Sequence, residues 1–198
     1  MIEQLRQATR TQHAALDQYI YPIIQSVRKP DEYARLLSMF YGYFQPVYQQ
    51  LEIHIDKTIL PDYDRRRKPS AIMHDLDQLG FARSLNELCN EVPSINSSEK
   101  AFGALYVLEG STMGGKIISK KLKENSGLGD ECFLFFNAYG ELNPRMWGIF
   151  IESLSNPALI EKSATIIISA AETFSHFHKW VTYFYPAGEL HTNETIKA

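Results

Sequence analysis

The sequence predicts an all-α protein, and three observations carry that prediction. Apolar residues recur at the spacing of helix faces along most of the 198 residues. Proline or a helix-capping residue opens most of these segments, as expected at helix N-termini. No hairpin dipeptide is flanked by alternating apolar residues, so the sequence supports no sheet. Because 44% of the residues are hydrophobic, we expect one domain over residues 1–198 with a full core and a frayed tail from about residue 188.

Two helices are predicted in the first third of the chain. The first spans about residues 3–18, and one of its faces carries Leu5, Thr9, Gln12, His13 and Leu16. The second begins at Pro30 and Asp31, because proline and an acidic residue both favour the first turn of a helix. Pro46 falls near the middle of this helix, where proline bends the backbone.

Four further helices are predicted, over about residues 69–80, 97–125, 143–154 and 157–186. Asn96 and Glu99 have the spacing of a capping box, with Asn96 as the cap, before the second of these helices. Gly127 lies just beyond its end, as glycine often does at a helix C-terminus. We therefore expect a helical bundle whose longest segments lie at the two ends and the centre of the chain.

Composition and charge exclude several classes of function. The chain has 20 basic and 23 acidic residues and a net charge of -3, so its overall charge indicates no polyanion-binding surface. We interpret the basic run from Arg65 to Lys68 as a solvated loop and not as a nucleic-acid patch. No apolar run approaches the ~18 residues of a membrane span, and the first residues do not resemble a signal peptide. We expect a cytoplasmic protein with no nucleic-acid partner and no membrane span, in which Cys89 and Cys132 are reduced and buried.

The most informative segment is residues 103–118, a predicted helix with glycines in its interior. Gly110, Gly114 and Gly115 each cost about 0.5–1 kcal/mol relative to alanine at such a position. Gly110 and Gly114 are four residues apart, so we expect them to share one face of bare backbone. Another helix or a flat ligand could pack directly against that face, and the spacing alone favours the helix.

His13 lies on the apolar face of the first helix and is the candidate metal ligand. A lone histidine on such a face is usually a core residue. Asp17, however, follows one turn later, where its carboxylate could accept a hydrogen bond from the imidazole Nδ1. That contact would fix the tautomer and leave Nε2 for a metal ion. His176 and His178 are two residues apart on a helix, so they face different directions and make a poor metal pair.

Two separated blocks of the sequence are similar to those of a known family. The first is Leu5-x-x-Ala8-Thr9-x-x-x-His13-x-x-x-Asp17, and the second is Tyr106-Val-Leu-Glu-Gly110-Ser-Thr-Met-Gly114-Gly115. A weaker third block is Phe135-Phe136-x-x-Tyr139-Gly140, followed by Trp147 and Phe150. In this order and spacing they resemble the proximal and distal helices of the haem oxygenase family, and specifically its bacterial, biliverdin-producing branch. The resemblance implies a haem-oxygenase-like helical bundle that cleaves haem, as both substrate and prosthetic group, to biliverdin, CO and Fe²⁺.

The resemblance also implies roles for the two faces of the haem site. His13 would be the axial ligand of the haem iron, and Asp17 would orient its ring. Gly110 and Gly114 would place distal backbone that has no Cβ atoms over the haem, and this would steer bound O2 toward the porphyrin edge. Gly115 belongs to the same haem-contacting segment, and Ser111 would take part in proton delivery.

Residues beyond these two faces would hold the rest of the macrocycle. Arg6 and Tyr106 match positions that contact a haem propionate in the family. Phe174 and Phe177, on the last predicted helix, are expected to form an apolar wall of the pocket. This last expectation rests on their aromatic character and their place in the fold, and packing in the core is an equal alternative for the pair.

The sequence departs from the family pattern at two places. Animal-type members carry an aspartate directly after the first distal glycine, and here that position is Ser111. A serine could join a proton relay, but it has no carboxylate to supply. A gap-free extension from Phe135 places Gly148 and Glu152 where animal-type members have a lysine and an arginine near the propionates. The seating of the haem, and hence the biliverdin isomer, stays open.

Two alternatives to a haem oxygenase remain open at this point. One is a haem-binding carrier or sensor without turnover, which the departure at Ser111 motivates. The other is a haem-free enzyme of the thiaminase-II type on the same scaffold. That enzyme would need a catalytic cysteine, whereas Cys89 and Cys132 lie outside both blocks. A haem oxygenase would need an external electron donor, a ferredoxin or a flavoprotein reductase, and Arg6 and Arg10 could dock an acidic donor.

Overall fold

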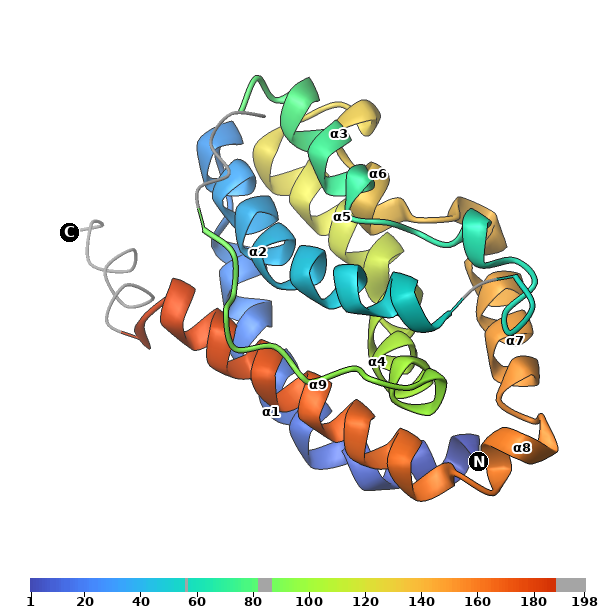
Figure 1. The fold of residues 1–198 in the computed structure, drawn as a ribbon. Helices are drawn as coiled ribbons and strands as arrows, with labels where there is room; N and C mark the ends of the chain where they lie inside the picture. Colours follow the sequence, from blue (N-terminus) through green and yellow to red (C-terminus); the bar gives the residue numbers. More distant parts are fainter. Residues whose placement is uncertain (56, 82–86, 188–198) are drawn as a thin grey trace.

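The computed structural model describes residues 1–55, 57–81 and 87–187, and within these residues it contains helices and no strand (Figure 1). The all-α prediction is therefore confirmed. The α-helices are α1 (Ile2–Ser26), α2 (Pro30–His54), α3 (Ser70–Gln78), α4 (Ser98–Gly110), α5 (Thr112–Ser126), α6 (Leu134–Asn137), α7 (Asn143–Ser153), α8 (Pro157–Ile160) and α9 (Ser163–Phe184). Short 3-10 helices lie at Tyr63–Arg65, Asp130–Cys132 and Gly140–Leu142. The predicted frayed tail falls outside the described residues.

Helix boundaries differ from the predictions where tertiary packing decides them. α1 continues past residue 18 to Ser26, because Ile20, Ile23 and Ile24 are buried against the core. α2 runs through Pro46 without ending. The cap of α4 is Ser97, whose Oγ accepts a hydrogen bond from Lys100 N at 3.3 Å, and not Asn96.

α4 is the central helix of the bundle. Residues 101–109 are all buried, and the helix packs most extensively against α9 and also contacts α2. Figure 1 shows α9 crossing in front of α1 at the bottom of the molecule and α2 lying across the upper part. A Cβ on Gly103 would lie 2.4 Å from the carbonyl oxygen of Ile166, so this glycine allows the backbones of α4 and α9 to approach closely.

An aromatic cluster joins α2, α6 and α9. Phe40 of α2 lies 5.3 Å from both Phe135 and Phe136 of α6, measured between ring centroids. Phe177 of α9 stacks on Tyr43 at 4.7 Å. Such edge-to-face and stacked pairs add to the free energy gained by burying the rings. The cluster fixes the position of α6, which is too short to be stable by itself.

The predicted single helix over residues 97–125 is two helices, α4 and α5, that meet at Ser111. The hydroxyl of Ser111 donates to Leu108 O at 2.7 Å, and that of Thr112 donates to Glu109 O at 2.7 Å. Side-chain donors of this kind compete with the backbone for the carbonyls of the preceding turn and bend or end helices. The expectation of one continuous helix was therefore wrong at this position.

Candidate functional site

Two contacts tie α1 to α4 and α5 and leave the middle of α1 between them. At one end, the hydroxyl of Tyr106 on α4 lies in hydrogen-bonding contact with Thr9 of α1. At the other end, Asn125 Nδ2 on α5 donates to Gln25 O at 3.1 Å. Burial raises the pKa of Tyr106, while the Thr9 contact and the positive charge of Arg6 lower it. The structure thus brings Arg6 and Tyr106 to the same end of the candidate site.

His13 lies between these two contacts with its side chain 59% exposed. Its ring stacks on Phe174 of α9, with centroids 5.1 Å apart and an interplanar angle of 27°. Its Nε2 lies 3.2 Å from Oδ2 of Asp17, so Asp17 contacts Nε2 and not Nδ1 as the sequence led us to expect. Phe174 packs on one face of the His13 ring. Asp17 lies one helical turn after His13, which places its carboxylate beside Nε2. Nε2 would become available to a metal once the two exposed side chains separate.

The three glycines of the second block have different surroundings. A Cβ on Gly115 would lie 1.9 Å from the carbonyl oxygen of Phe136, so Gly115 packs directly on α6. A Cβ on Gly110 would meet Trp147 at 3.6 Å, which is ordinary contact. A Cβ on Gly114 would meet nothing within 4 Å. Gly110 is therefore covered by Trp147, and the open backbone is at Gly114.

The two aromatic residues expected to line the pocket are separated by the structure. Phe174 lies beside His13, as described above. Phe177 is buried in the aromatic cluster, where it stacks on Tyr43 and lies 5.9 Å from Phe44. The alternative of core packing therefore describes Phe177, and the structure brings only Phe174 to the imidazole.

Trp147 is a residue of this region that the sequence did not assign a role. Its ring lies 5.8 Å from that of Tyr106 and stacks on Phe150 at 5.5 Å, in addition to its contact with Gly110. It therefore covers the backbone of α4 at its last residue. Trp147 was visible in the third sequence block, but nothing in its spacing indicated that it would pack on a glycine far earlier in the chain.

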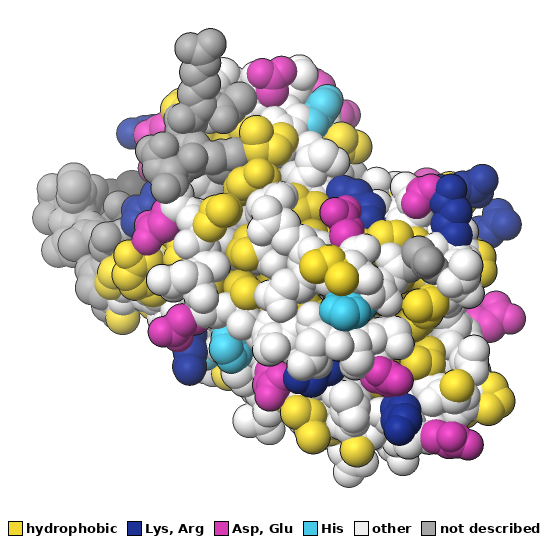
Figure 2. Space-filling model, in the orientation of Figure 1, with side chains coloured by type: hydrophobic (Ala, Val, Ile, Leu, Met, Phe, Trp, Pro, Cys, Tyr) yellow, Lys and Arg dark blue, Asp and Glu magenta, His cyan; other side chains and the backbone are white. Residues whose placement is uncertain are grey.

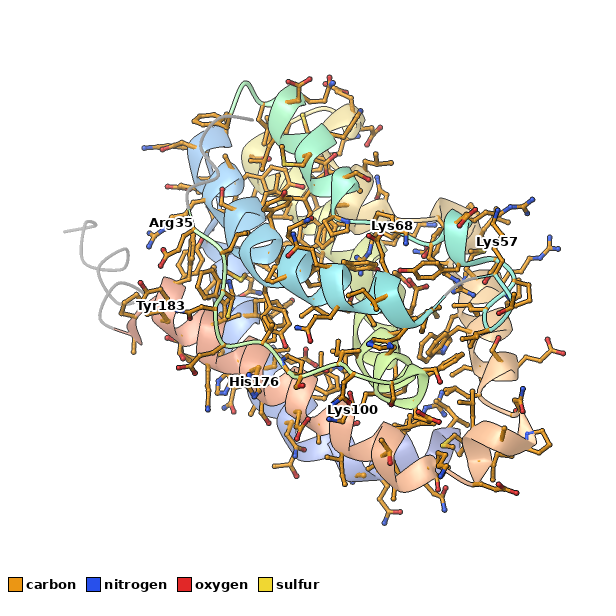
Figure 3. All side chains as sticks on the ribbon, in the orientation of Figure 1. Arg35, Lys57, Lys68, Lys100, His176 and Tyr183 are labelled. Carbon is orange, nitrogen blue, oxygen red and sulfur yellow. The ribbon has the colours of Figure 1, made fainter. Side chains whose placement is uncertain are left out.

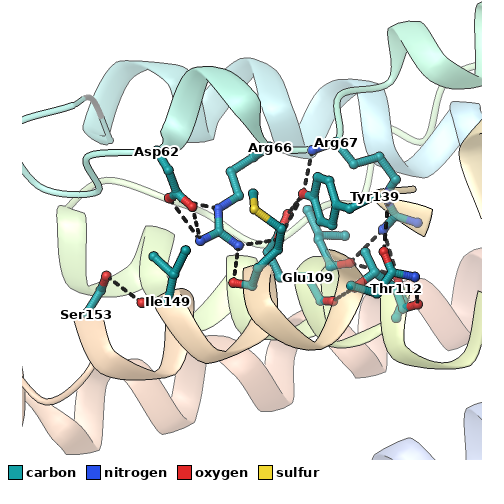
Figure 4. A network of polar contacts seen from close by, with 12 residues as sticks. Asp62, Arg66, Arg67, Glu109, Thr112, Tyr139, Ile149 and Ser153 are labelled. Carbon is teal, nitrogen blue, oxygen red and sulfur yellow. Dashed lines mark hydrogen bonds and ion pairs between the residues drawn. The ribbon is translucent and has the colours of Figure 1, made fainter. Parts of the chain in front are cut away.

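Behind the helix break lies a buried network of charged and polar groups (Figure 4). Arg66 is 2% exposed and Glu109 is 1% exposed. Arg66 Nη1 donates to Glu109 Oε2 at 2.8 Å, and Arg66 Nη2 donates to Asp62 Oδ2 at 2.8 Å. Glu109 therefore forms a buried salt bridge with Arg66. The solvated-loop interpretation of the basic run was wrong for Arg66, because it is buried and paired with Glu109 of α4 and with the partly buried Asp62 four residues earlier.

Tyr139 and Arg67 continue this network toward Ser111. The hydroxyl of Tyr139 donates to Glu109 and accepts a hydrogen bond from Arg67 N at 2.6 Å. Burial first, and then the charge of Glu109, raise the pKa of Tyr139 far above its usual value. Arg67 is 7% exposed, so the loop interpretation fails for it too, and its Nη2 donates to Ser111 Oγ at 2.7 Å. Four consecutive basic residues gave no sign that two of them point inward.

Other candidate groups lie apart from this region. His176 on α9 points toward the segment before α4, where its Nδ1 lies 2.7 Å from Glu91 O (Figure 3). Both cysteines are unpaired and buried, as predicted. No cluster of three or more His, Cys, Asp or Glu side chains able to hold a metal ion occurs in the part of the chain that is described. None of the helices in that part has the length and apolar character needed to cross a bilayer.

The surface of the described residues shows no concentration of one charge on the face drawn in Figure 2, where acidic and basic side chains are interspersed. This distribution agrees with the small net charge of the chain. It gives no support to a polyanion-binding face on that side of the molecule.

The fold and the candidate site together define an all-α protein with an exposed imidazole on α1, open backbone on α5, and contacts from α1 to both α4 and α5. The chain belongs to the haem oxygenase family, since the family model described as "Heme oxygenase" matches residues 1–183. A heme oxygenase of Xanthomonas campestris pv. campestris (strain 8004) is 30% identical over 151 residues, which cover 75% of this chain and 87% of that protein. The structure of heme oxygenase from Leptospira interrogans has the same fold, with a TM-score of 0.66 at 17% identity, covering 91% of this chain and 98% of that one. Family membership assigns the chain to enzymes of haem degradation.

Proposed function

We propose that this chain is a single-domain haem oxygenase, over residues 1–198, that cleaves haem to biliverdin, CO and Fe²⁺ with O2 and electrons from an external donor. The observation that carries the proposal is the placement of the His13 imidazole and the open backbone of Gly114 between two α1 contacts. Family membership supports haem as both substrate and prosthetic group.

The residues at this site fit a porphyrin. An exposed imidazole is a common axial ligand of haem iron, and His13 would provide it after its Nε2 parts from Asp17. Phe174 holds the imidazole by its face and so limits the orientations that the ring can take. Gly114 has room where any other residue would place a Cβ. Bound haem would supply the iron and the reactive ring carbons, and the protein would supply ligation, shape and hydrogen bonds.

Polar groups at the α1 end of the site would orient the haem. Arg6 is 58% exposed in its side chain and is only loosely paired with Glu3 at 3.8 Å, so its guanidinium is available to a propionate. Tyr106 is fixed by its contact with Thr9 and directs a hydroxyl to the same end. Gly110 and Ser111 would lie on the distal side, where the helix break exposes Ser111.

The two alternatives make different use of the same residues. A haem carrier or sensor would bind haem through His13 without turnover. A haem-free enzyme of the thiaminase-II type needs a reactive thiol, but burial raises the pKa of both Cys89 and Cys132. A raised thiol pKa lowers the fraction of thiolate, the nucleophilic form. The environment of the cysteines therefore favours the two haem-binding candidates.

Haemin reconstitution tests the proposal directly. A haem oxygenase would show a Soret band that gives way to a bilin band when ascorbate, or ferredoxin with its reductase, is added in air. A carrier or sensor would keep its Soret band, and a haem-free enzyme would not bind haemin. His13→Ala is expected to weaken axial ligation and to abolish the conversion, whereas His54→Ala, at the end of α2, would behave as the wild type. Retention of both properties by His13→Ala would remove His13 from the site.

The partner and the location follow from the same proposal. We propose a ferredoxin or a flavoprotein reductase as the electron donor, because haem cleavage by enzymes of this family consumes electrons from an external source. We propose a cytoplasmic location. The two buried, unpaired thiols support it, since reduced cysteines are usual in a reducing compartment.

A further inference from the structure

Arg67 is a buried cation that no carboxylate neutralises directly. Its guanidinium lies over the rings of Phe135 and Phe44, at 4.4 and 5.4 Å from their centroids. Among the described residues no Asp or Glu forms an ion pair with it, whereas the neighbouring Arg66 is paired with both Asp62 and Glu109. Its Nε is buried and has no hydrogen-bond partner. Burying a guanidinium that lacks a carboxylate partner and leaves one N–H unbonded costs free energy. This cost points to a role for the contacts that its Nη2 makes.

The Nη2 atom of Arg67 contacts the break between α4 and α5. Arg67 Nη2 donates to Leu108 O at 2.6 Å and to Ser111 Oγ at 2.7 Å. Ser111 Oγ donates its own proton to the same carbonyl at 2.7 Å. If the Ser111 hydroxyl turns to another acceptor, Leu108 O keeps the hydrogen bond from Arg67. The proton of Ser111 can therefore be redirected without leaving a carbonyl unsatisfied.

The electrostatic surroundings of Ser111 favour a negatively charged acceptor. Ser111 ends α4 and directly precedes α5, so the opposite partial charges of the two helix ends meet there and largely cancel. The positive charge at Ser111 comes from Arg67 on the buried side. Ser111 itself is exposed and lies three residues before Gly114 in the chain.

We propose that Arg67 and Ser111 form a cationic donor pair that holds an anionic, proton-accepting ligand of the bound haem, with Arg67 positioning the Ser111 hydroxyl. The proposal rests on the proposed function, because it requires haem beside Gly114. It gives a physical role to the position where the sequence lacks a carboxylate: the hydroxyl carries the proton, and Arg67 supplies the charge and the fixed orientation.

Azide binding to the haemin-loaded protein measures this pair without turnover. Ser111→Ala is expected to weaken azide binding by about 10-fold or more, because a hydrogen bond to a charged group is lost. Arg67→Met is expected to weaken it further, and Arg67→Lys to recover part of the loss, because lysine keeps the charge but not the planar fork. Ser126→Ala is the matched control, because Ser126 is the last residue of α5, and it would leave azide affinity unchanged.

A neutral ligand separates this role from a structural one. CO binding to the reduced haem protein would stay within about 2-fold of the wild type in Ser111→Ala, because CO carries no charge for the pair to stabilise. Equal azide affinity in wild type and Ser111→Ala would overturn the inference, and so would an equal loss of azide and CO affinity. If Arg67→Met does not fold, Ser111→Ala and Arg67→Lys decide the question. Failure of the wild type to bind haemin would instead refute the proposed function together with this inference, so the two failures are distinguishable.

Discussion

At the scale of single residues, two adjacent glycines show how one residue type serves two purposes. Gly115 is required for packing, because a Cβ there would lie 1.9 Å from the backbone of Phe136. Gly114 has no such neighbour within 4 Å. Neither glycine has a positive φ in the structure, so conformational freedom does not explain them. The two glycines differ in the atoms beside the Cβ position: the backbone of Phe136 at Gly115, and nothing within 4 Å at Gly114.

Alanine substitution would separate the two roles. Gly115→Ala is expected to destabilise the protein without haem by about 3 kcal/mol, because the backbones of α5 and α6 must move apart. Gly114→Ala is expected to stabilise it by about 0.5–1 kcal/mol, since alanine favours the helix, and to weaken haemin binding. Urea unfolding and haemin titration measure the two effects. Similar unfolding midpoints for the two variants would contradict the packing role of Gly115.

At the scale of elements, α6 depends on a side chain from another helix. Asp75 of α3 is fully buried and accepts hydrogen bonds from Leu134 N and Phe135 N, both at 2.8 Å. It thereby caps the N-terminus of a four-residue helix. Because Gly115 packs on Phe136 of the same helix, the position of α5 also depends on this cap.

The burial of Asp75 predicts a specific pH dependence. Burial raises the pKa of Asp75 to about 6, although hydrogen bonds from Phe135 N, His74 and Leu134 N oppose the change. The folded protein therefore holds this proton more tightly than the unfolded chain. The contribution of Asp75 to the free energy of unfolding is largest at low pH, falls as the pH rises from about 4 to about 6, and is constant above that range.

Comparison with Asp75→Asn isolates this contribution from those of other carboxyl groups. The difference in unfolding free energy, wild type minus variant, is expected to decrease between about pH 4 and pH 6 and to level off near pH 7. Urea unfolding of both proteins across this range measures it. A difference that is independent of pH, or that increases with pH, would show that the buried carboxyl does not titrate as described.

At the scale of the whole molecule, the proposed site combines segments that are distant in the sequence. His13 on α1 and Gly114 on α5 are about a hundred residues apart in the chain. α9 packs along both α1 and α4 and so holds the two halves of the site in one bundle. The surface of α1 also carries the exposed basic residues Arg6 and Arg10, of which Arg6 lies 3.8 Å from the carboxylate of Glu3.

The exposed charge of Arg10 predicts a salt-dependent interaction with an acidic electron donor. Arg10→Glu is expected to lower the rate of donor-dependent haem cleavage several-fold at low salt, because it reverses the charge that steers the two proteins together. The difference would shrink at high salt. The rate with ascorbate would not change, since ascorbate needs no docking surface. An unchanged rate with ferredoxin and its reductase at low salt would exclude this docking surface.

The helical content of this chain could be predicted from sequence because periodicity and capping signals are local. The same local signals placed the start of α2 and both ends of α3 and α7 within a few residues of their observed positions. They failed at Ser111, where hydroxyl groups replace the next turn of backbone hydrogen bonds, and along α1, where burial of Ile20 and Ile24 extends the helix. Helix propensities of single residues do not include the effects of burial or of these side-chain hydrogen bonds.

The sequence by itself determined the fold class and the family, because these depend on residue types at fixed spacings. Only the tertiary structure decided that Gly114 is open while Gly115 packs on α6, that Phe177 belongs to the core, and that Arg66 and Arg67 are buried. The physical reason is that burial and pairing depend on which side chains arrive from other elements, and Glu109 and Ser111 reach the two arginines only through the folded chain.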